Sequence, residues 1–325
     1  MSERVFVSEL KVGEHVEQVF AVRDRILRER RDGIPFLKLR LADKTGEVDG
    51  VLWEDALGAN ARIVNQEFVQ VKGRVERYQR SNSINISRIE AVPPEGVNTR
   101  FFLPETPRSR KELWRRMEEL LKGVQNRHLS ALLTAFFGDE AFATVFREAP
   151  AAKRFHHAYL GGLLEHSVAV ATMAEKVAEQ YPELDRDLLL AGAILHDVGK
   201  IREYKFRTSI DYTDEGRLLG HIVIGDRMVA GKIAGIPDFP EELAQKFRHL
   251  LLAHHGEMEY GSPVSIRIPE AFALHFLDNL DAKLNTVKSV IEHAGETGTH
   301  WTPYDRRLGR EFFLGERDKG PPTLF

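Results

Sequence analysis

The sequence contains no cysteine. This absence excludes disulfide bonds, thiolate metal sites and cysteine nucleophiles. Long apolar runs are also missing, since none approaches the roughly 20 residues that a membrane-spanning helix needs. The first five residues lack the apolar core of a secretion signal. We therefore expect a soluble protein of the cytoplasm that has no membrane partner.

Neither sign of charge is in large excess. Lys and Arg number 46 against 49 Asp and Glu, which gives a formal net charge of -3. Any affinity for nucleic acid must then come from local basic patches, because the chain as a whole has no positive field. Hydrophobic residues make up 42% of the 325 residues, which is enough for a sizeable core and suits two domains.

Residues 1–92 show the pattern of strands and turns. Leu37, Leu39 and Leu41 alternate with Phe36, Lys38 and Arg40, and this period of two indicates a half-buried strand. The turn signal DKTG at 43–46 separates it from a strand over 47–53. Further strands are expected over 16–27, 68–75 and 84–89, with a short helix near 55–60. Five strands with a helix before the fourth predict an OB-type barrel.

Beyond residue 92 the pattern becomes helical. Four prolines between 93 and 107 predict a linker over 93–108. Leu113, Met117 and Leu120 then recur at helical spacing, so residues 109–150 are predicted to form a helical connector. Residues 151–314 are predicted to form a second domain, interrupted by a polar loop over 205–216, and 315–325 an irregular tail. The expected fold class is an all-β barrel followed by an all-α domain.

Histidine and aspartate recur in five separated stretches of this helical region. The central stretch is LHDVGK, residues 195–200. An imidazole beside a carboxylate on an apolar helix is costly to bury unless something binds the pair. A lone histidine on an apolar face is usually a packed core residue, but five stretches in order argue against that interpretation. The predicted metal ligands are His166, His196, Asp197, His221, His254, His255 and Asp278.

These residue types suit phosphate chemistry. Neutral imidazole binds Mn, Fe, Co, Ni and Zn well, and Asp197 carries two oxygens that could bridge two cations. Two cations about 4 Å apart would turn water into a nucleophile and offset the charge of a phosphoryl group. Lys200, three residues after Asp197, could meet a substrate phosphate as a point charge. Asp197 and Lys200 are therefore the catalytic candidates, and Asp281 is expected to support a ligand.

Other polar side chains near this constellation keep two interpretations. His156 and His157 either reach a substrate phosphate or cap the following helix. Arg202, Lys205 and Arg207 either clamp a phosphate backbone or belong to a solvated loop.

The predicted barrel carries candidate contacts for a single strand. Phe36 and Trp53 could stack a base, while Lys38 and Arg40 hold phosphates. The loop after the fourth strand adds Arg77, Tyr78 and Arg80. A further basic run over residues 23–31 lies in the predicted first loop. The alternatives are that this run is an ordinary solvated loop and that Phe36 packs against the helical domain.

The order H…HD…D, with His196-Asp197 in HDVGK, resembles the HD-domain phosphohydrolases. The resemblance covers about residues 154–288 and implies an all-helical fold with His166, His196, Asp197 and Asp278 as core ligands. The three further histidines resemble members with a second metal. Members that cleave cyclic dinucleotides carry a Glu four residues before the first histidine, where this chain has Gly162. That departure argues against this subgroup and against a third metal.

The whole chain is similar to the YhaM-type 3′–5′ exoribonucleases. The similarity lies in the barrel followed by the strings HHAYLGGLLEH (156–166), DYTDEGRLLGH (211–221) and DNLDAK (278–283). It implies removal of nucleotides from the 3′ end of single-stranded RNA, with single-stranded DNA as a second candidate substrate. It also implies divalent ions, two per chain, with Mn²⁺ favoured over Co²⁺, Fe²⁺ or Ni²⁺.

Two other functions compete with this one. The chain could be an HD-domain phosphohydrolase of a small nucleotide or cyclic nucleotide, with the barrel serving assembly. It could also be a binding module whose metal is only structural, although Asp197 with Lys200 speaks against that. The residues do not decide the physiological metal, the cleavage polarity, the general acid or whether the chain forms a homo-oligomer.

Overall fold

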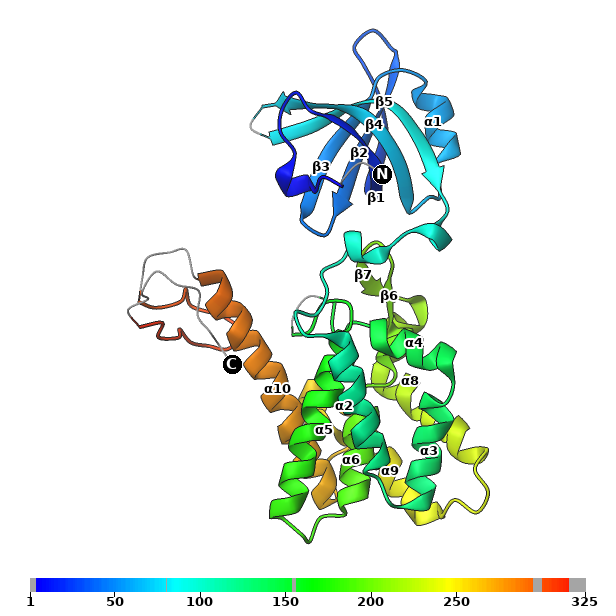
Figure 1. The fold of residues 1–325 in the computed structure, drawn as a ribbon, viewed down its shortest axis with the longest axis vertical. Helices are drawn as coiled ribbons and strands as arrows, with labels where there is room; N and C mark the ends of the chain where they lie inside the picture. The colour runs from blue at the N-terminus through cyan, green and yellow to red at the C-terminus, as the bar shows by residue number, and fades with distance from the viewer. Residues whose placement is uncertain (1–3, 80, 154–155, 295–299, 316–325) are drawn as a thin grey trace. The chain divides into compact units, whose positions relative to one another are not determined.

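The computed structural model describes residues 4–79, 81–153, 156–294 and 300–315 (Figure 1). The chain forms two compact units. The first comprises residues 1–105 with 206–211, and the second comprises residues 106–205 with 212–325. The predicted tail over 315–325 lies outside the described residues from 316 onward.

Five strands of the first unit close into a barrel in the order β1-β2-β3-β5-β4. Their bounds are β1 His15–Glu29, β2 Pro35–Asp43, β3 Gly46–Leu52, β4 Phe68–Tyr78 and β5 Ser81–Val92. Neighbouring strands are antiparallel except for β3 and β5, which are parallel. Helix α1 (Ala56–Arg62) stands between β3 and β4 in the chain. This arrangement confirms the predicted OB-type barrel.

Alternation along β2 decides which side chains fill the barrel. Leu37, Leu39 and Leu41 are buried and join the barrel core, whereas Lys38 is half-buried and Arg40 is exposed. A polar and an apolar face therefore lie back to back on one strand, as the period of two predicts. The outward face of β2 is thus available for a ligand.

Part of the predicted linker packs on the barrel. Residues 94–96 and 99–101 form the short 3-10 turns η2 (Pro94–Gly96) and η3 (Thr99–Phe101). The ring of Phe102, which is fully buried, lies 4.8 Å from the ring of Phe68 on β4. This aromatic pair ties the segment to the barrel, and the first unit extends accordingly to residue 105.

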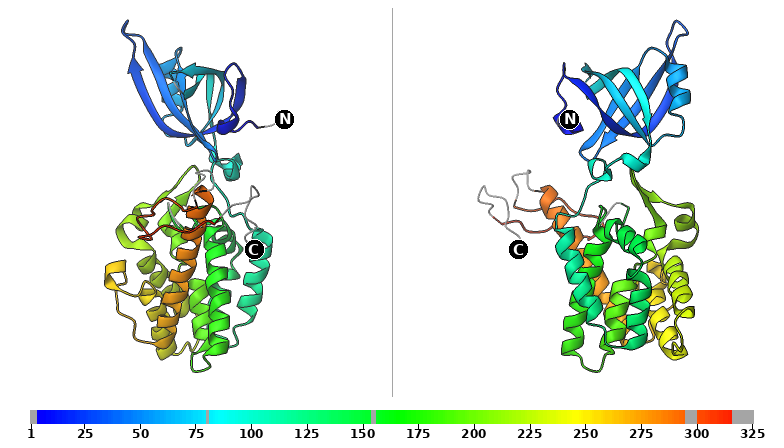
Figure 2. Two further views of the ribbon diagram at one scale, coloured as in Figure 1. Left: turned by 90° about the vertical axis from the view of Figure 1, so that its left-hand side faces the viewer. Right: turned by 45° about the vertical axis from the view of Figure 1, so that its right-hand side comes forward.

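The second unit is built around α5. This helix packs against α2, α4, α6 and α10, and the views agree that α10 runs alongside it (Figures 1 and 2). The bounds of the helices are α2 Arg110–Lys122, α3 Arg127–Phe137, α4 Glu140–Glu148, α5 Gly162–Gln180, α6 Arg186–Leu195, α7 Lys200–Glu203, α8 Asp214–Ala234, α9 Glu241–Ala253 and α10 Pro269–His293.

Polar side chains fix where several helices begin. Ser109, Asn126, Asp139, Asp185 and Thr213 each stand just before a helix and accept a hydrogen bond from a backbone N–H of its first turn. Such caps satisfy donors that would otherwise lack a partner. They define the helix starts locally, from the sequence alone.

The polar loop expected over 205–216 contains a small sheet instead. Strands β6 (Tyr204–Phe206) and β7 (Ile210–Tyr212) pair with each other, so the predicted all-α domain over 151–314 contains strands, and residues 206–211 group with the first unit. The rings of Tyr204 and Tyr212 lie 5.2 Å apart, and such aromatic pairs across strands stabilise short sheets. A run this short and polar shows no clear strand period, which is why the sequence does not reveal it.

Within the described residues, no single helix is long and apolar enough to cross a membrane. Among the helices that the structure describes, α3 and α4 taken together, with a bend of 79° between them, meet the length and composition that a span requires.

Candidate metal centre

Three helices of the second unit bring four of the predicted ligands together. His166 lies in the first half of α5, His196 and Asp197 directly follow α6, and Asp278 lies on α10. The Nε2 atom of His166 is 3.1 Å from His196 Nε2, 3.1 Å from Asp278 Oδ1 and 3.4 Å from Asp197 Oδ2. These nitrogen and oxygen atoms point at a common centre, which defines the first donor set.

Three histidines form a second donor set beside the first. His221 lies in α8, His254 ends α9 and His255 follows it. One ring nitrogen of each lies within 4.8 Å of those of the other two. Asp197 Oδ1 is 3.5 Å from His221 Nε2 and 3.8 Å from His254 Nε2, while its Oδ2 is 3.4 Å from both His166 and His196. Asp197 therefore offers one oxygen to each set.

Several atoms of the second set are buried without a hydrogen-bond partner in the part of the chain that the structure describes. They are Asp197 Oδ1, His221 Nε2 and His254 Nε2. A buried acceptor that makes no hydrogen bond costs about 1–3 kcal/mol, so such atoms are rarely left this way. Imidazole nitrogens and a carboxylate oxygen that converge are ligands for a divalent cation, and the residues present fit one.

The other ring nitrogens hold these imidazoles in the right orientation. The Nδ1 atoms of His196 and His254 lie 2.9 Å and 2.7 Å from the backbone carbonyl oxygens of Ala193 and Leu251. Because a carbonyl only accepts, Nδ1 carries the proton and the Nε2 lone pair is directed at the centre. His221 is oriented in the same way by a carboxylate, with its Nδ1 3.2 Å from Glu203 Oε1.

The surrounding charges keep most donors in the deprotonated form that a metal needs. Burial opposes ionisation of Asp197, but the charge of Lys200, whose Nζ lies 2.6 Å from Oδ2, outweighs it and lowers the pKa of that carboxyl. Burial and the charge of His255 lower the pKa of His254, which is therefore neutral. His166 differs: hydrogen bonds to Asp278 and Asp281 overcome the effect of burial and raise its pKa to about 10.

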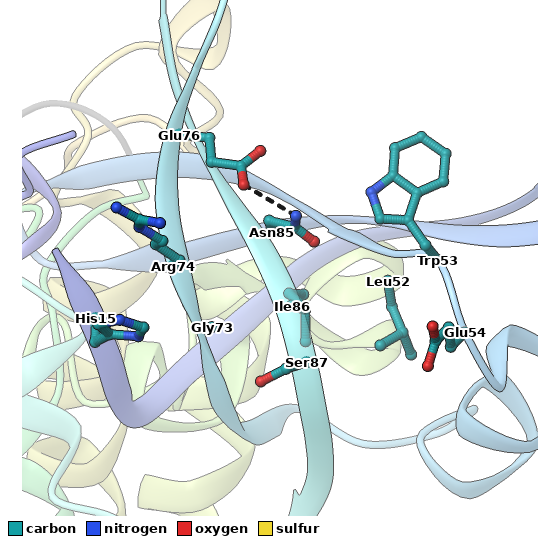
Figure 3. A pocket seen from close by; sticks show the side chains of 10 residues that line it. All are labelled: His15, Leu52, Trp53, Glu54, Gly73, Arg74, Glu76, Asn85, Ile86 and Ser87. Atoms are coloured by element: carbon teal, nitrogen blue, oxygen red, sulfur yellow. Dashed lines mark hydrogen bonds between the residues drawn. The ribbon is translucent and has the colours of Figure 1, made fainter. Parts of the chain in front are cut away.

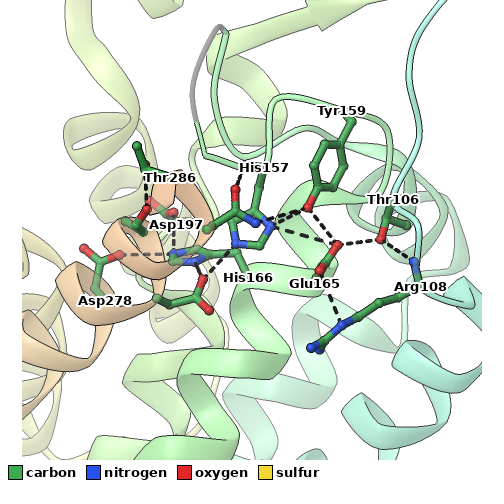
Figure 4. Close-up of polar contacts among 12 residues, drawn as sticks. Thr106, Arg108, His157, Tyr159, Glu165, His166, Asp197, Asp278 and Thr286 are labelled. Atoms are coloured by element: carbon green, nitrogen blue, oxygen red, sulfur yellow. Dashed lines mark hydrogen bonds and ion pairs between the residues drawn. The ribbon is translucent and has the colours of Figure 1, made fainter. Parts of the chain in front are cut away.

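A buried chain of hydrogen bonds supports His166 from behind (Figure 4). His166 Nδ1 lies 2.7 Å from Asp281 Oδ2, which is also 2.8 Å from His157 Nε2. His157 Nδ1 in turn lies 2.9 Å from the hydroxyl of Tyr159, which donates to Glu165. This series of hydrogen bonds thus connects the predicted metal ligand His166 to Glu165 in the first turn of α5.

The same chain ends in the segment that leads out of the barrel. Glu165 accepts a hydrogen bond from the hydroxyl of Thr106, the first residue of the second unit, and lies 3.5 Å from the guanidinium of Arg108 (Figure 4). His157 is only 2% exposed. Its placement gives it a structural partner at both ring nitrogens and does not favour the predicted contact with a substrate phosphate.

Removing the carboxylate of Asp281 should weaken metal binding although Asp281 is not a ligand of the first set. We expect Asp281→Ala to lower the Mn²⁺ affinity about 10- to 100-fold, since groups that orient a ligand typically contribute this much. Asp281→Asn, which keeps an oxygen acceptor, should reduce the Mn²⁺ affinity less than Asp281→Ala does. Titration calorimetry with Mn²⁺ measures both, with Lys283→Ala on the exposed side of α10 as the control. Equal affinities for all three variants would contradict the orienting role.

Close backbone contact brings the second set to Asp197. Gly220 has φ of 71° and bends α8 just before His221, whose backbone N–H then donates to Glu203 Oε1 at 3.0 Å. Gly199 packs against this bend, and a Cβ atom there would lie 2.0 Å from the carbonyl oxygen of His221. Only glycine allows the HD stretch and α8 to approach this closely.

Two functional residues of this region were not apparent in the sequence. Glu203 follows the HD stretch in a charged run, and nothing in its spacing indicates that it holds His221. Tyr204, which lines a cavity beside the second donor set, begins a strand in a region that was expected to be loop. Arg202 pairs with Glu215 at 3.0 Å, and Lys205 and Arg207 are exposed, so their predicted contact with a phosphate backbone stays a prediction.

The barrel has two adjoining hollows on its outer face. One, of about 430 Å³, is lined by residues of β3, β4 and β5 and by Trp53, and a hydrogen bond from Asn85 to Glu76 crosses it (Figure 3). The other, of about 220 Å³, lies at the predicted strand-binding face and includes Phe36, Lys38, Trp53, Arg77 and Tyr78. Trp53, Glu76 and Asn85 border both hollows.

Phe36 and Trp53 on this face meet, whereas Lys38 and Arg40 are already paired with carboxylates. The rings of Phe36 and Trp53 lie 5.0 Å apart, and Trp53 is 43% exposed. Lys38 Nζ is 2.8 Å from Asp49, and Arg40 lies 3.8 Å from both Asp49 and Glu47. A phosphate would have to compete with these carboxylates. Arg80, predicted to contact nucleic acid, lies outside the described residues.

Two protein-family models match separate parts of the chain, one for each unit of the fold. The family model "HD domain" matches residues 163–283, and the model "OB-fold nucleic acid binding domain" matches residues 20–92. The helicase model TraI_2 matches residues 103–183, which span α2 to α5. The chain has no GxxxxGK(S/T) loop of the kind that binds nucleotide phosphates in many helicases.

Relatives match almost the whole chain. The 3′-5′ exoribonuclease YhaM of Listeria welshimeri is 34% identical over 286 residues, which is 88% of this chain and 90% of the relative. The chain belongs to the YhaM family. The YhaM of Bacillus subtilis is 35% identical over 285 residues, 87% of this chain and 89% of the relative. This chain contains both an OB-fold and an HD domain.

One solved structure that matches covers a much smaller share of this chain than the YhaM relatives do. The second OB-fold domain of replication protein A from Methanococcus maripaludis is 23% identical and covers 26% of this chain, with a TM-score of 0.22.

Proposed function

We propose that this protein is a metal-dependent 3′–5′ exoribonuclease that shortens single-stranded RNA by hydrolysis, with two divalent ions, Mn²⁺ favoured. Single-stranded DNA is proposed as a second substrate. The observation that carries the proposal is the position of Asp197, which presents one carboxylate oxygen to each of two buried donor sets. The 3′ polarity rests on the names of the relatives.

Divalent cations held by these atoms would lower the pKa of a water molecule and offset the charge of the phosphoryl group. The residues of the chain prepare this chemistry. Asp197 and Asp278 stay ionised, and the neutral His254 directs its Nε2 at the centre. Lys200, which is buried with its Nζ 2.6 Å from Asp197, places a positive charge where a phosphodiester would approach.

The proposed role of the barrel is to hold the strand by stacking rather than by charge. Phe36 and Trp53 form an aromatic platform, and bases of any sequence stack on such platforms. The nearby Lys38 and Arg40 are paired with carboxylates, which reduces their gain from meeting phosphates. Binding should therefore depend on Trp53 more than on either cation.

A timed digestion tests the reaction and its direction together. Single-stranded RNA labelled at its 5′ end, incubated with Mn²⁺, should give a ladder that shrinks from the unlabelled 3′ end. The same strand without metal, or with a chelator, should stay intact. Turnover of mononucleotides without a ladder would favour a phosphohydrolase of small substrates, and release of the label in the first step would contradict the 3′ polarity.

Replacing Trp53 measures the contribution of the barrel. We expect Trp53→Ala to weaken binding of a single-stranded RNA about 5- to 150-fold, because stacking of one base contributes about 1–3 kcal/mol. Fluorescence anisotropy with a labelled strand measures the affinity. Trp301→Ala, which removes an exposed tryptophan from the helical unit, is the matched control. Equal effects of the two substitutions would argue against the platform.

A further inference from the structure

A cavity of about 470 Å³ opens beside the second donor set. His221 and His255 form its metal-side wall, and Lys200 stands next to them. The rest of the lining comes from the segment after α4 and from the small β6-β7 sheet: Ala151, Ala152, Lys153, His156, Tyr204 and Tyr212. Cavities of about 300–1,000 Å³ hold a single small molecule, so this one suits one nucleotide and not several.

Part of the cavity wall is aromatic, formed by Tyr204 and Tyr212. Tyr204 is 8% exposed and its ring lies 5.2 Å from that of Tyr212. Glu203, the residue directly before Tyr204, holds His221, since its Oε1 lies 3.2 Å from His221 Nδ1. The aromatic wall and a predicted metal ligand are therefore connected through two adjacent residues, and such support favours a fixed spacing between them.

The lining of the cavity also includes two cationic side chains, Lys153 and Lys200. Lys153 Nζ is 5.4 Å from the centre of the Tyr212 ring, and Lys200 Nζ is 2.6 Å from Asp197. His156 completes this side of the lining. A ligand that combines a flat aromatic part with an anionic part matches both features at once, since the ring takes the face of Tyr212 and the anion meets the cations.

We propose that this cavity binds the terminal nucleotide of the strand, with its base against Tyr212 and its phosphate towards Lys200 and Lys153. The proposal deepens the proposed function and rests on it. Water adds to phosphorus, the bond between phosphorus and the 3′ oxygen of the preceding nucleotide breaks, and that oxygen takes the proton. The products are a nucleoside 5′-monophosphate, held in the cavity, and a strand with a new 3′ hydroxyl.

The product itself is the probe. Titration calorimetry of the full chain with Mn²⁺ present should show that adenosine 5′-monophosphate binds more tightly than inorganic phosphate. Tyr212→Ala should weaken the binding of the nucleotide about 5- to 150-fold and leave that of phosphate unchanged, because only the base stacks. Tyr212→Phe should behave like the unaltered protein. Tyr181→Ala, which removes an exposed tyrosine at the end of α5, is the control.

Lys153→Met provides a second, independent variant in case Tyr212→Ala does not fold. It should weaken the binding of both the nucleotide and phosphate. Absence of nucleotide binding to the unaltered protein, or equal nucleotide affinity in Tyr212→Ala, would overturn the proposal. So would unchanged binding of both probes to Lys153→Met.

Binding of the mononucleotide does not require strand cleavage, so the two proposals fail separately. A chain that shortens RNA but binds the nucleotide independently of Tyr212 has the proposed activity without this cavity. A chain that binds the nucleotide through Tyr212 but leaves RNA intact has the cavity without the activity.

Discussion

Asp197→Asn should lower the rate of RNA shortening about 10³-fold or more. The substitution preserves shape but removes the charge that both donor sets share, and a metal centre contributes several kcal/mol to the transition state of such reactions. Because Asp197 Oδ1 and Oδ2 face different sets, the loss should not be restored by raising the Mn²⁺ concentration. Single-turnover digestion with enzyme in excess measures the rate of the chemical step.

The matched control is Asp139→Asn. Asp139 caps α4 through its side-chain oxygen, and asparagine caps as well, so the same chemical change outside the centre should leave the rate unaltered. Circular dichroism of both variants checks the fold. If Asp197→Asn kept the normal rate while folded, the shared carboxylate would have no part in the reaction.

Metal affinity should rise about tenfold with each pH unit across the neutral range. In the metal-free protein the pKa of His166 is about 10, above the ordinary value of 6.5, because Asp278 and Asp281 outweigh burial. Its imidazole is therefore protonated near pH 7, and a metal at Nε2 must displace that proton. The fraction of His166 that is free to bind grows tenfold per unit until the pH reaches about 10.

Titration of the metal-free protein with Mn²⁺ at pH 6.5, 7.5 and 8.5 measures this slope directly. In the same protein, the protonated His166 contributes stability that is complete below pH 6.5 and disappears as the pH rises through about 10. Metal binding and stability should thus respond to alkali in opposite directions. Affinity that stayed flat between pH 6.5 and 8.5 would contradict the protonated state of His166.

The barrel and the first donor set could be predicted because their signals are local. For the barrel, the alternation of Leu37, Leu39 and Leu41 with polar residues directly indicates a strand. For the donor set, an aspartate beside a histidine on an apolar helix is rarely buried without a bound partner. The predicted ligands, which lie on or directly after five helices, do meet in the structure, although their role as ligands stays a prediction. The order of the motifs, rather than any single residue, contained this information.

The supporting residues could not be predicted because their partners are distant in sequence. Asp281 lies 115 positions from His166, and the hydrogen bond from His157 to Asp281 spans 124. No periodicity marks such pairs. The β6-β7 sheet was missed for a different reason, since three-residue strands are held by the Tyr204–Tyr212 pair and not by an apolar pattern. Pairing of Lys38 and Arg40 with carboxylates depends likewise on the register of β2 against β3.

The absence of a side chain at Gly199 sets the distance between the two donor sets. With the carbonyl oxygen of His221 only 2.0 Å from where a Cβ would stand, the main chains themselves set how far apart the two halves of the centre sit. Metal–ligand lengths tolerate shifts of about 0.2 Å, much less than the displacement that one methyl group would force. The absence of a Cβ atom at this position therefore determines the spacing of the two donor sets, and any other residue here would force them apart.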